Sequence, residues 1–395
     1  MEAIILAGGL GTRLRGVVSD LPKCLAPVDG TPFLQYQLDW LSRFDISHVV
    51  LSVGYLKEVI FSFIESRSWP FEITYAIEEE PLGTGGGIRL ALGKCRGNKV
   101  FVLNGDTFFN ADLNTLPFVA PVTLALKPMR DFERYGAVDW DGELVTAFHE
   151  KRPCAEGLIN GGIYAIDRSQ LEISLYPRRF SFEKDVLEPL SDYGLVAGVV
   201  QDGYFIDIGI PEDYARAQQE LPEIQAVLKA SDAVLASGAD TLFLDRDGVI
   251  NRWLPGDYVR SWEQFTFLPG MLESLRAWAG KFRHILIVSN QRGVGKGKMT
   301  QEALDEVHAR MLEEIRQAGG RIDGIYVCTA VGEEDPRRKP NPGLFREAQQ
   351  DYPDITPERS LMLGDSHYDR EFARNCGMDF VLMETADIAL RFNPS

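Results

Sequence analysis

The segment after the first apolar run combines glycines with cations, a pattern that suits a phosphate-binding site. Ile4 to Ala7 reads as a buried strand, and it leads into Gly8-Gly9 and Gly11-Thr12-Arg13. Glycines let backbone N–H groups approach an anion closely because no Cβ stands in the way. Arg13 and Lys23 add the positive charge that a nucleoside triphosphate requires. The alternative is that these glycines only form a tight strand-to-helix turn.

Other segments of the first half add candidate ligands. Glu80 to Gly87 is a second glycine-rich loop before a helix, which could hold a base or sugar or could be a flexible turn. Asp106 and Asp207 each end an apolar strand. Each alone could be a cap or turn residue, but together they suggest a metal between two strand ends. Glu150-Lys151 suits a hexose-like ligand, although a surface ion pair would look the same. Asn160-Gly161-Gly162 lies in the same interval.

Two aspartates follow the first strand of the second half. Asp245 and Asp247 come after Thr241 to Leu244, and their i, i+2 spacing points both carboxylates the same way. Two negative charges at so short a distance repel each other, so the pair needs a cation between the carboxylates or a shared proton. One carboxylate can then act as nucleophile and the other as general acid and base. Calcium loops also use Asp-x-Asp, so the pair by itself is a weak signal.

Later segments of this half supply polar groups at further strand ends. Ile285 to Val288 leads into Ser289-Asn290-Gln291, a hydroxyl and amides for phosphate oxygens. Arg338-Lys339 places cations in a loop. A third apolar run ends in Gly364-Asp365 and reaches Asp369 four residues on. The strand ends of this half thus carry, in order, Asp-x-Asp, Ser, Lys and Gly-Asp-x-x-x-Asp.

Length and composition set the limits for these sites. The chain has 395 residues, 45% hydrophobic and 25% charged, which favours two domains of an ordinary globular protein. A net charge of −17 disfavours nucleic acid as a partner but not phosphorylated substrates. We see no membrane-spanning run and no secretory signal, and the five cysteines are scattered. These features predict a cytoplasmic protein without a membrane partner, and they leave a homo-oligomer open.

The elements that must position the sites alternate between strands and helices. In the first half we expect strands at 3–7, 48–53, 72–77, 99–103, 122–127, 162–166 and 195–200, and helices at 33–43, 56–66 and 84–93. This alternation predicts an α/β fold with a mostly parallel, doubly wound sheet, which binds ligands at the carboxyl ends of its strands. A helix from Pro211 that Pro222 interrupts connects it to a second such sheet. We predict domains at 1–235 and 236–395.

The first half resembles the sugar-1-phosphate nucleotidyltransferase family, over about residues 1–220. The resemblance rests on Gly-Gly-x-Gly-Thr-Arg-Leu, Pro22-Lys23, Pro81-Leu82-Gly83-Thr84 and the two aspartates, Asp106 and Asp207. Within this family it is similar to the guanylyltransferases of D-glycero-α-D-manno-heptose 1-phosphate. It implies GTP and a heptose phosphate as substrates, Arg13 and Lys23 as catalytic cations, and Mg²⁺ on Asp106 and Asp207. The implied nucleotide contacts are Leu6, Ala7, Gly8, Gly9, Gly11, Thr12, Arg13, Lys23, Pro81, Leu82, Gly83, Thr84 and Gly105; the implied sugar-phosphate contacts are Glu150, Lys151, Asn160 and Gly161.

The second half resembles the haloacid dehalogenase superfamily of phosphohydrolases, with a minimal cap on a Rossmann-like domain. The resemblance implies Asp245 as nucleophile, Asp247 as acid and base, and Ser289 and Lys339 as phosphoryl-binding groups. It implies Mg²⁺ on Asp245, the Asp247 backbone carbonyl and Asp365, with Asp369 in support. The half is also similar to heptose 1,7-bisphosphate 7-phosphatases and then to histidinol phosphatases, and Asn290 and Arg292 are the expected sugar-phosphate contacts.

The two resemblances together predict consecutive reactions, in which a phosphatase makes heptose 1-phosphate and a guanylyltransferase converts it to GDP-heptose. Alternatives are a mannose 1-phosphate or other hexose transferase, a phosphatase of another sugar phosphate or of histidinol phosphate, and a non-catalytic regulatory C-terminal domain. Related phosphatases usually hold zinc in a Cys/His loop before the lysine. The loop Val327 to Arg338 has only Cys328, so we expect no zinc there and a loop held by packing or hydrogen bonds.

Overall fold

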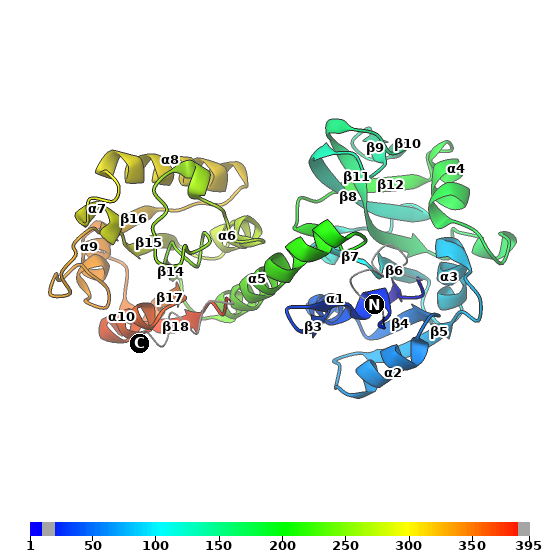
Figure 1. Cartoon of the computed structure of the whole chain (residues 1–395), viewed down its shortest axis with the longest axis horizontal. Helices are drawn as coiled ribbons and strands as arrows, with labels where there is room; N and C mark the ends of the chain where they lie inside the picture. The colour runs from blue at the N-terminus through cyan, green and yellow to red at the C-terminus, as the bar shows by residue number, and fades with distance from the viewer. Residues whose placement is uncertain (10–19, 386–395) are drawn as a thin grey trace. The chain divides into compact units, whose positions relative to one another are not determined.

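The N-terminal unit, Met1–Gln219, is built around a mixed sheet that has nine strands among the described residues (Figure 1). The computed structural model describes residues 1–9 and 20–385. The strands are β1 (Glu2–Leu6), β4 (His48–Val53), β5 (Glu72–Ile77), β6 (Lys99–Asn104), β8 (Val122–Phe132), β9 (Ala137–Trp140), β10 (Val145–Phe148), β11 (Cys154–Asp167) and β12 (Val196–Val200). The main path runs β10-β9-β11-β6-β1-β4-β5, and β8 and β12 extend it from β11.

The strand directions correct one expectation. Strands β6, β1, β4 and β5 are parallel, as predicted. Strand β11 then returns antiparallel to β6, β8 and β9, so the sheet is mixed rather than mostly parallel. The reason is local, because β9 to β11 are joined by short connections instead of crossover helices.

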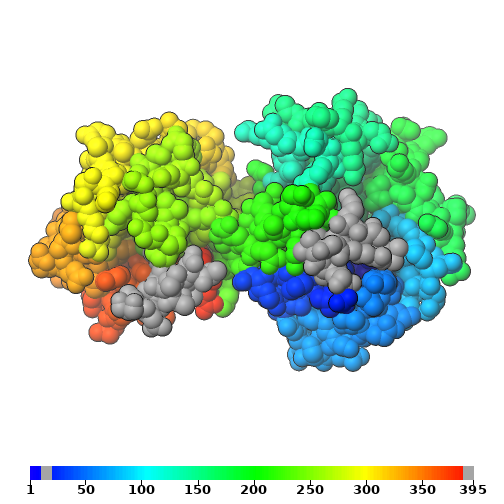
Figure 2. Space-filling model, viewed as in Figure 1, coloured from blue at the N-terminus to red at the C-terminus, as the bar shows by residue number. Residues whose placement is uncertain are grey.

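Helices cover both faces of the parallel strands. They are α1 (Phe33–Leu41), α2 (Lys57–Glu65) and α3 (Gly83–Leu92), whereas the short α4 (Glu188–Ser191) packs against β10. On β5, Ala76 packs in one core with Ile88 of α3, whereas the ring of Tyr75 lies 4.3 Å from that of Phe61 in α2. Successive strand residues face opposite ways, so α2 and α3 lie on opposite faces. Figure 2 shows the α2 segment (blue) and the β9–β10 segment (teal) at opposite edges of this unit.

The strand register brings the predicted ligands of the first half to one edge. Leu6, at the end of β1, is paired with Ser52 of β4 and with Asn104 of β6. The segments that follow these strand ends therefore meet at the carboxyl edge. A two-stranded ribbon of β7 (Thr107–Phe109) and β13 (Phe205–Asp207) pairs Thr107 with Asp207 and so carries Asp207 to the same edge. A second ribbon joins β2 (Pro27–Val28) and β3 (Thr31–Pro32).

The C-terminal unit, Glu220–Ser395, contains a parallel sheet of five strands in its described part. Its order is β16-β15-β14-β17-β18. The strands are β14 (Thr241–Leu244), β15 (His284–Asn290), β16 (Gly324–Cys328), β17 (Ser360–Gly364) and β18 (Asp379–Leu382); the helices are α6 (Met271–Ala279), α7 (Arg292–Gly295), α8 (Gln301–Gln317), α9 (Gly343–Asp351) and α10 (His367–Cys376).

Alternate residues of β14 bury two separate cores, as a doubly wound sheet requires. Leu242 packs with Leu275 of α6 and Met311 of α8, whereas Phe243 packs with Phe345 of α9 and Phe372 of α10. Between β14 and α6 the chain forms only the 3-10 turn Trp262–Gln264, so no large cap is inserted there. This agrees with the predicted minimal cap.

The helix α5 (Pro211–Ala236) runs through Pro222 without a break, so the expected interruption is wrong. A proline inside a helix removes one hydrogen bond and costs about 3 kcal/mol. The buried side chains on both sides of it, Leu221 and Ile224, offset this loss. The chain divides into its two units within this helix, between Gln219 and Glu220. The boundary near residue 235 stays a prediction. None of the described helices has the length and apolarity needed to cross a bilayer.

Candidate active sites

A cavity of about 420 Å³ opens at the carboxyl edge of the N-terminal sheet. It is lined by Leu6, Ala7, Gly8, Gly9, Lys23, Cys24, Glu78, Pro81, Gly83, Thr84, Gly87, Asn104, Gly105 and Asp106. Most of the predicted nucleotide contacts are among these residues. Leu82 is buried beside the cavity and does not line it. Gly11, Thr12 and Arg13 lie outside the described residues.

Two glycines of this cavity leave no room for a side chain. A Cβ on Gly105 would lie 2.3 Å from the carbonyl oxygen of Leu6, so the loop after β6 touches the backbone of β1. Gly83 has a φ of +72°, and a Cβ there would lie 2.5 Å from the carbonyl oxygen of Phe180. Both loops therefore present backbone rather than side chains near the cavity, which is the property expected of a phosphate or nucleotide site.

Lys23 joins the two aspartates that were predicted to bind metal. Its Nζ lies 2.5 Å from Oδ2 of Asp106 and 3.9 Å from Oδ1 of Asp207. The lysine side chain is only 12% exposed. Two carboxylates and one ammonium leave one negative charge, and carboxylate oxygens are ligands that Mg²⁺ prefers. The geometry fits a cation site, and its occupation by Mg²⁺ stays a proposal.

The predicted sugar-phosphate contacts of this unit are not gathered at the cavity. The side chain of Glu150 is 94% exposed, 4.0 Å from Lys184 Nζ, and neither Glu150 nor Lys151 lines the cavity. The side chain of Asn160 donates to the Tyr164 hydroxyl at 3.0 Å and accepts from the Gly162 N–H at 2.9 Å. A Cβ on Gly161 would lie 2.5 Å from the ring of Phe109, so packing alone accounts for this glycine. The four sugar-phosphate assignments stay predictions.

The second cavity, of about 430 Å³, lies at the carboxyl edge of the C-terminal sheet. The predicted residues that line it are Asp245, Asp247, Ser289, Asn290, Arg292, Lys339 and Asp369. Asp365 does not line the cavity, because it is fully buried beneath it. Each strand end of the central three strands, β14, β15 and β17, therefore contributes polar groups to one place, as the sequence predicted.

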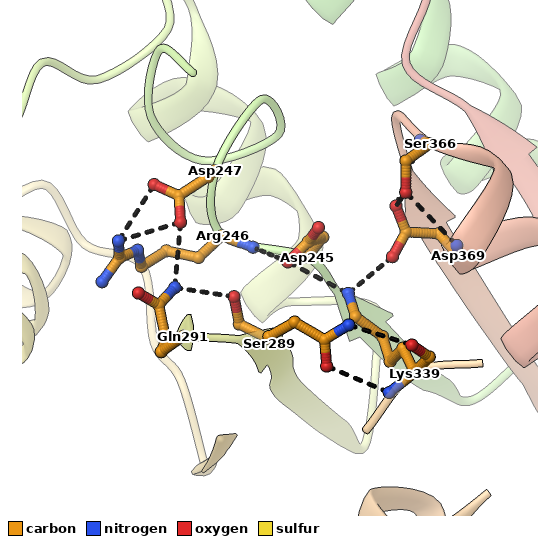
Figure 3. Close-up of polar contacts among 9 residues, drawn as sticks. Asp245, Arg246, Asp247, Ser289, Gln291, Lys339, Ser366 and Asp369 are labelled. Carbon is orange, nitrogen blue, oxygen red and sulfur yellow. Dashed lines mark hydrogen bonds and ion pairs between the residues drawn. The ribbon is translucent and has the colours of Figure 1, made fainter. Parts of the chain in front are cut away.

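Lys339 lies among the buried carboxylates (Figure 3). Its Nζ is 3.1 Å from Oδ1 of Asp245 and 2.5 Å from Oδ1 of Asp369. Burial favours the neutral amine, but these two carboxylates outweigh that effect and raise the pKa of Lys339. Asp369 is also fixed by Ser366, whose N–H and hydroxyl both donate to Oδ2.

Three carboxylates in this place fit a divalent cation. Carboxylate oxygens of Asp245, Asp365 and Asp369 all lie within 4.8 Å of one another, and all three residues are buried. With the ammonium of Lys339, the group has a formal charge of −2. A set of oxygen donors with that charge matches Mg²⁺, which neutralises like charges that would otherwise repel at close range.

Asp247 is held by a separate set of partners, visible on the other side of Asp245 in Figure 3. Arg246 Nη2 lies 2.9 Å from both of its carboxylate oxygens. Asn251 Nδ2 and Gln291 Nε2 donate to it, also at 2.9 Å. Burial alone would raise the pKa of Asp247, but Arg246 and these hydrogen bonds lower it below its ordinary value. Gln291 also donates to the Ser289 hydroxyl at 2.9 Å, which links the two predicted catalytic side chains.

The side-chain amide of Asn290 bonds to the backbone of Lys339, and its assignment as a sugar-phosphate contact stays a prediction. Its Nδ2 donates to the carbonyl of Lys339, and its Oδ1 accepts from the N–H of Lys339, both at 3.0 Å. Asn290 lines the cavity, and these bonds fix the backbone of the loop that carries Lys339. The preceding loop is held by hydrogen bonds too. Asn341 donates to the carbonyls of Glu333 and Asp335 at 3.0 and 2.8 Å.

A family model described as nucleotidyl transferase matches residues 2–224, more than half of the chain. The chain belongs to the nucleotidyl transferase family. A second model, described as HAD-hydrolase-like, matches residues 336–388 of this nucleotidyl transferase. The chain thus joins members of both families predicted from its motifs.

Each half of the chain is similar to known proteins, and the match covers most of the length of those proteins. The D-glycero-alpha-D-manno-heptose 1-phosphate guanylyltransferase of Aneurinibacillus thermoaerophilus is 48% identical over 226 residues, 56% of this chain and 98% of that protein. The D-glycero-alpha-D-manno-heptose-1,7-bisphosphate 7-phosphatase of Mycobacterium bovis is 44% identical over 138 residues, 34% of this chain and 71% of that protein. The crystal structure of HddC from Yersinia pseudotuberculosis, also solved with GMP-PN, is 37% identical with a TM-score of 0.50, over 55% of this chain and 97% of that one.

Several site residues of this nucleotidyl transferase were missed by sequence reasoning. Glu78 accepts hydrogen bonds from Ser52 Oγ at 2.8 Å and from the Leu82 N–H at 3.2 Å, and so ties the second glycine-rich loop to β4. Glu78 could have been found from the sequence, because it follows directly after the predicted strand at 72–77. The cavity-lining residues of the C-terminal unit without a predicted role are Trp253, Leu254, Gly256, Asp257, Tyr258, Val259, Lys296, Arg338, Ser366 and Tyr368. Most lie in loops that have no regular pattern.

Proposed function

We propose that this chain is a bifunctional enzyme of GDP-D-glycero-α-D-manno-heptose synthesis. The C-terminal unit removes the 7-phosphate of heptose 1,7-bisphosphate. The N-terminal unit transfers GMP from GTP to the resulting heptose 1-phosphate and releases pyrophosphate. The observation that carries this proposal is that one chain joins relatives named for these two consecutive reactions. Most of the predicted nucleotide contacts line the cavity of the N-terminal unit, and most of the predicted phosphatase residues line the cavity of the C-terminal unit.

In the C-terminal unit, Asp245 is placed to act as the nucleophile. Its Oδ1 accepts from the Arg246 N–H at 2.7 Å and lies near Lys339 Nζ, which fixes the carboxylate at the cavity wall. The carboxylate attacks phosphorus while the bond to the sugar oxygen breaks, and that oxygen receives a proton from Asp247, which the Asp247 carboxylate must take up before this step. Water then attacks the aspartyl-phosphate, Asp247 takes its proton, and inorganic phosphate leaves.

Bound Mg²⁺ would add positive charge beside the phosphoryl oxygens in this step. Asp245, Asp365 and Asp369 would hold it. The Asp247 carboxylate already accepts hydrogen bonds from Arg246 and Gln291, so its backbone carbonyl is the better candidate ligand from that residue. Ser289 and Lys339 would bind the phosphoryl group itself.

The number of cations that line this cavity supports a bisphosphate substrate. Arg292, Lys296 and Arg338 line it in addition to Lys339. One phosphoryl group occupies Ser289 and Lys339, so the three further cations suit a second anionic group on the same substrate. This supports a sugar bisphosphate over histidinol phosphate, which carries a single phosphate.

In the N-terminal unit no covalent nucleophile is needed. An oxygen of the sugar phosphate attacks the α-phosphorus of GTP in line, and pyrophosphate leaves with the bonding electrons. Lys23 holds positive charge at the cavity wall, and Arg13 would supply more. Mg²⁺ on Asp106 and Asp207 would add charge beside the triphosphate. The glycine-rich loops supply backbone N–H groups for the nucleotide.

We also propose a cytoplasmic location. All five cysteines are free thiols, and four of them are buried. Free cysteines in this number agree with a reducing compartment. The nucleoside triphosphate that the proposed reaction consumes is available there.

The two activities can be tested separately on the full chain. Phosphate release is measured from heptose 1,7-bisphosphate, and pyrophosphate release from heptose 1-phosphate or mannose 1-phosphate with GTP, CTP, UTP or ATP, each with Mg²⁺ or with EDTA. We expect both releases, with GTP and heptose 1-phosphate preferred. Asp245→Asn should abolish phosphate release and leave pyrophosphate release unchanged. A preference for mannose 1-phosphate, or phosphate release that survives Asp245→Asn, would contradict the proposal.

A further inference from the structure

We propose that His308 is a positioning residue of the phosphatase, acting through Arg246 to hold the acid–base carboxylate of Asp247. The inference rests on the proposed function of the C-terminal unit. His308 lies on α8, far in sequence from the catalytic strand ends. No motif in the sequence pointed to it.

Arg246 is the connecting residue. It lies between the two catalytic aspartates in the sequence, and its side chain is fully buried. Its Nη2 holds both oxygens of Asp247, as Figure 3 shows. Its Nη1 lies 3.2 Å from Nε2 of His308. A guanidinium that grips a carboxylate on one side and an imidazole on the other has little freedom to rotate.

The chemistry of the two groups decides which ring nitrogen carries the proton. A guanidinium only donates, so Nε2 of His308 must accept, and the neutral ring carries its proton on Nδ1. Burial and the neighbouring Arg246 lower the pKa of His308 to about 4. The ring is therefore a neutral acceptor near neutral pH. The neutral ring accepts a hydrogen bond from Arg246 and adds no charge beside it, so Arg246 keeps its ion pair with Asp247.

The position of Asp247 matters most when the leaving group is a poor one. A sugar hydroxyl leaves slowly unless it receives a proton, so removing a well-placed general acid costs about 10²- to 10⁴-fold. A nitrophenolate leaves readily without that proton. Loss of the His308 contact would leave Nη1 of Arg246 buried without its acceptor, and Arg246 and Asp247 would shift together. The expected effect is selective for alkyl phosphates.

The test compares two leaving groups in matched variants. Steady-state kinetics are measured with 4-nitrophenyl phosphate, β-glycerophosphate and heptose 1,7-bisphosphate for the wild type, His308→Leu and His308→Gln. For His308→Leu we expect kcat on the alkyl phosphates to fall about 10- to 100-fold, with less than threefold change on the aryl phosphate. His308→Gln presents an acceptor oxygen near the position of Nε2 and should stay within threefold of the wild type on all substrates.

Arg246→Lys is a second, independent variant if His308→Leu does not fold, because lysine cannot hold both Asp247 oxygens and His308. It should show the same selective loss. Equal losses on aryl and alkyl phosphates, or His308→Gln behaving like His308→Leu, would overturn the proposal and show a packing role. A wrong sugar assignment is distinguishable, since the wild type would then hydrolyse the two simple phosphates and not heptose 1,7-bisphosphate.

Discussion

The ammonium of Lys339 lies 3.1 Å from Oδ1 of Asp245, and both side chains are almost completely buried. Burying a carboxylate has a desolvation cost, and the contact with the ammonium offsets part of that cost for Asp245. The same ammonium bonds to Asp369, so a single cation serves two carboxylates. Removing the ammonium of Lys339 should therefore lower the stability of the C-terminal unit as well as its activity.

Replacing Lys339 by methionine should destabilise the C-terminal unit by roughly 3–5 kcal/mol, because the buried carboxylates lose their cation. Urea unfolding followed by circular dichroism measures this. Adding Asp369→Asn to the variant should recover part of the loss. Lys296→Met is the matched control, an exposed lysine of the same cavity whose replacement should change stability by less than about 0.5 kcal/mol. Equal effects of the two single variants would contradict this account.

Lys23→Ala should lower pyrophosphate release by about 10²- to 10³-fold, since a preorganised positive group beside the reacting phosphates is lost. Phosphate release by the C-terminal unit should not change. Lys57→Ala is the control, because Lys57 pairs only with the exposed Glu79 at 3.5 Å among the described residues. A Lys23→Ala enzyme with full transferase activity would exclude Lys23 from the reaction.

Gly105→Ala should damage the nucleotide cavity. The added Cβ would lie 2.3 Å from the Leu6 carbonyl oxygen, which belongs to a central strand and cannot move aside. We expect a loss of roughly 1–3 kcal/mol in stability and a raised KM for GTP. Gly238→Ala is a suitable comparison, because a Cβ at that position would meet no heavy atom within 4 Å among the described residues. Unchanged GTP kinetics in Gly105→Ala would show that this backbone contact is dispensable.

Buried His308 makes a prediction about acid stability. Its pKa is about 4 in the folded protein, against an ordinary value of 6.5. Between these values the unfolded chain binds a proton that the folded chain does not, so stability falls as the pH drops. The contribution lost between pH 6.5 and pH 4 is up to roughly 3 kcal/mol. The free energy of unfolding of the wild type and of His308→Gln is measured with urea at pH 7.5 and pH 5. It should change less between the two pH values in the variant, and equal changes in both proteins would refute this role of His308.

Sequence reasoning found the residues that sit at strand ends. Asp245, Ser289 and Asp365 were found because each follows an apolar strand, and parallel strands bring their carboxyl ends to one edge. Arg246 lies between Asp245 and Asp247 in the sequence, but its role depends on a helix about sixty residues later, since His308 of α8 holds it. Such a pairing is set by how helices pack on the sheet, which no local pattern records.

The N-terminal sheet shows a similar limit. The parallel strands β4 and β5 were predicted with the bounds they have in the structure. Strands β9 and β10 were missed, because four-residue strands give too few alternations to detect. Lys23 and Asp207 were assigned separately, and only the β7–β13 ribbon shows how they meet.

The central claim is that one chain performs two consecutive reactions. The most direct measurement is a single reaction followed by mass spectrometry, in which the full chain receives D-glycero-α-D-manno-heptose 1,7-bisphosphate, GTP and Mg²⁺. The account predicts that heptose 1-phosphate forms first and that GDP-heptose follows, with one phosphate and one pyrophosphate released for each nucleotide sugar. Asp245→Asn should stop the sequence before the nucleotide sugar, and added heptose 1-phosphate should restore it. Release of phosphate without any GDP-heptose, or a nucleotide sugar that keeps the 7-phosphate, would contradict the account.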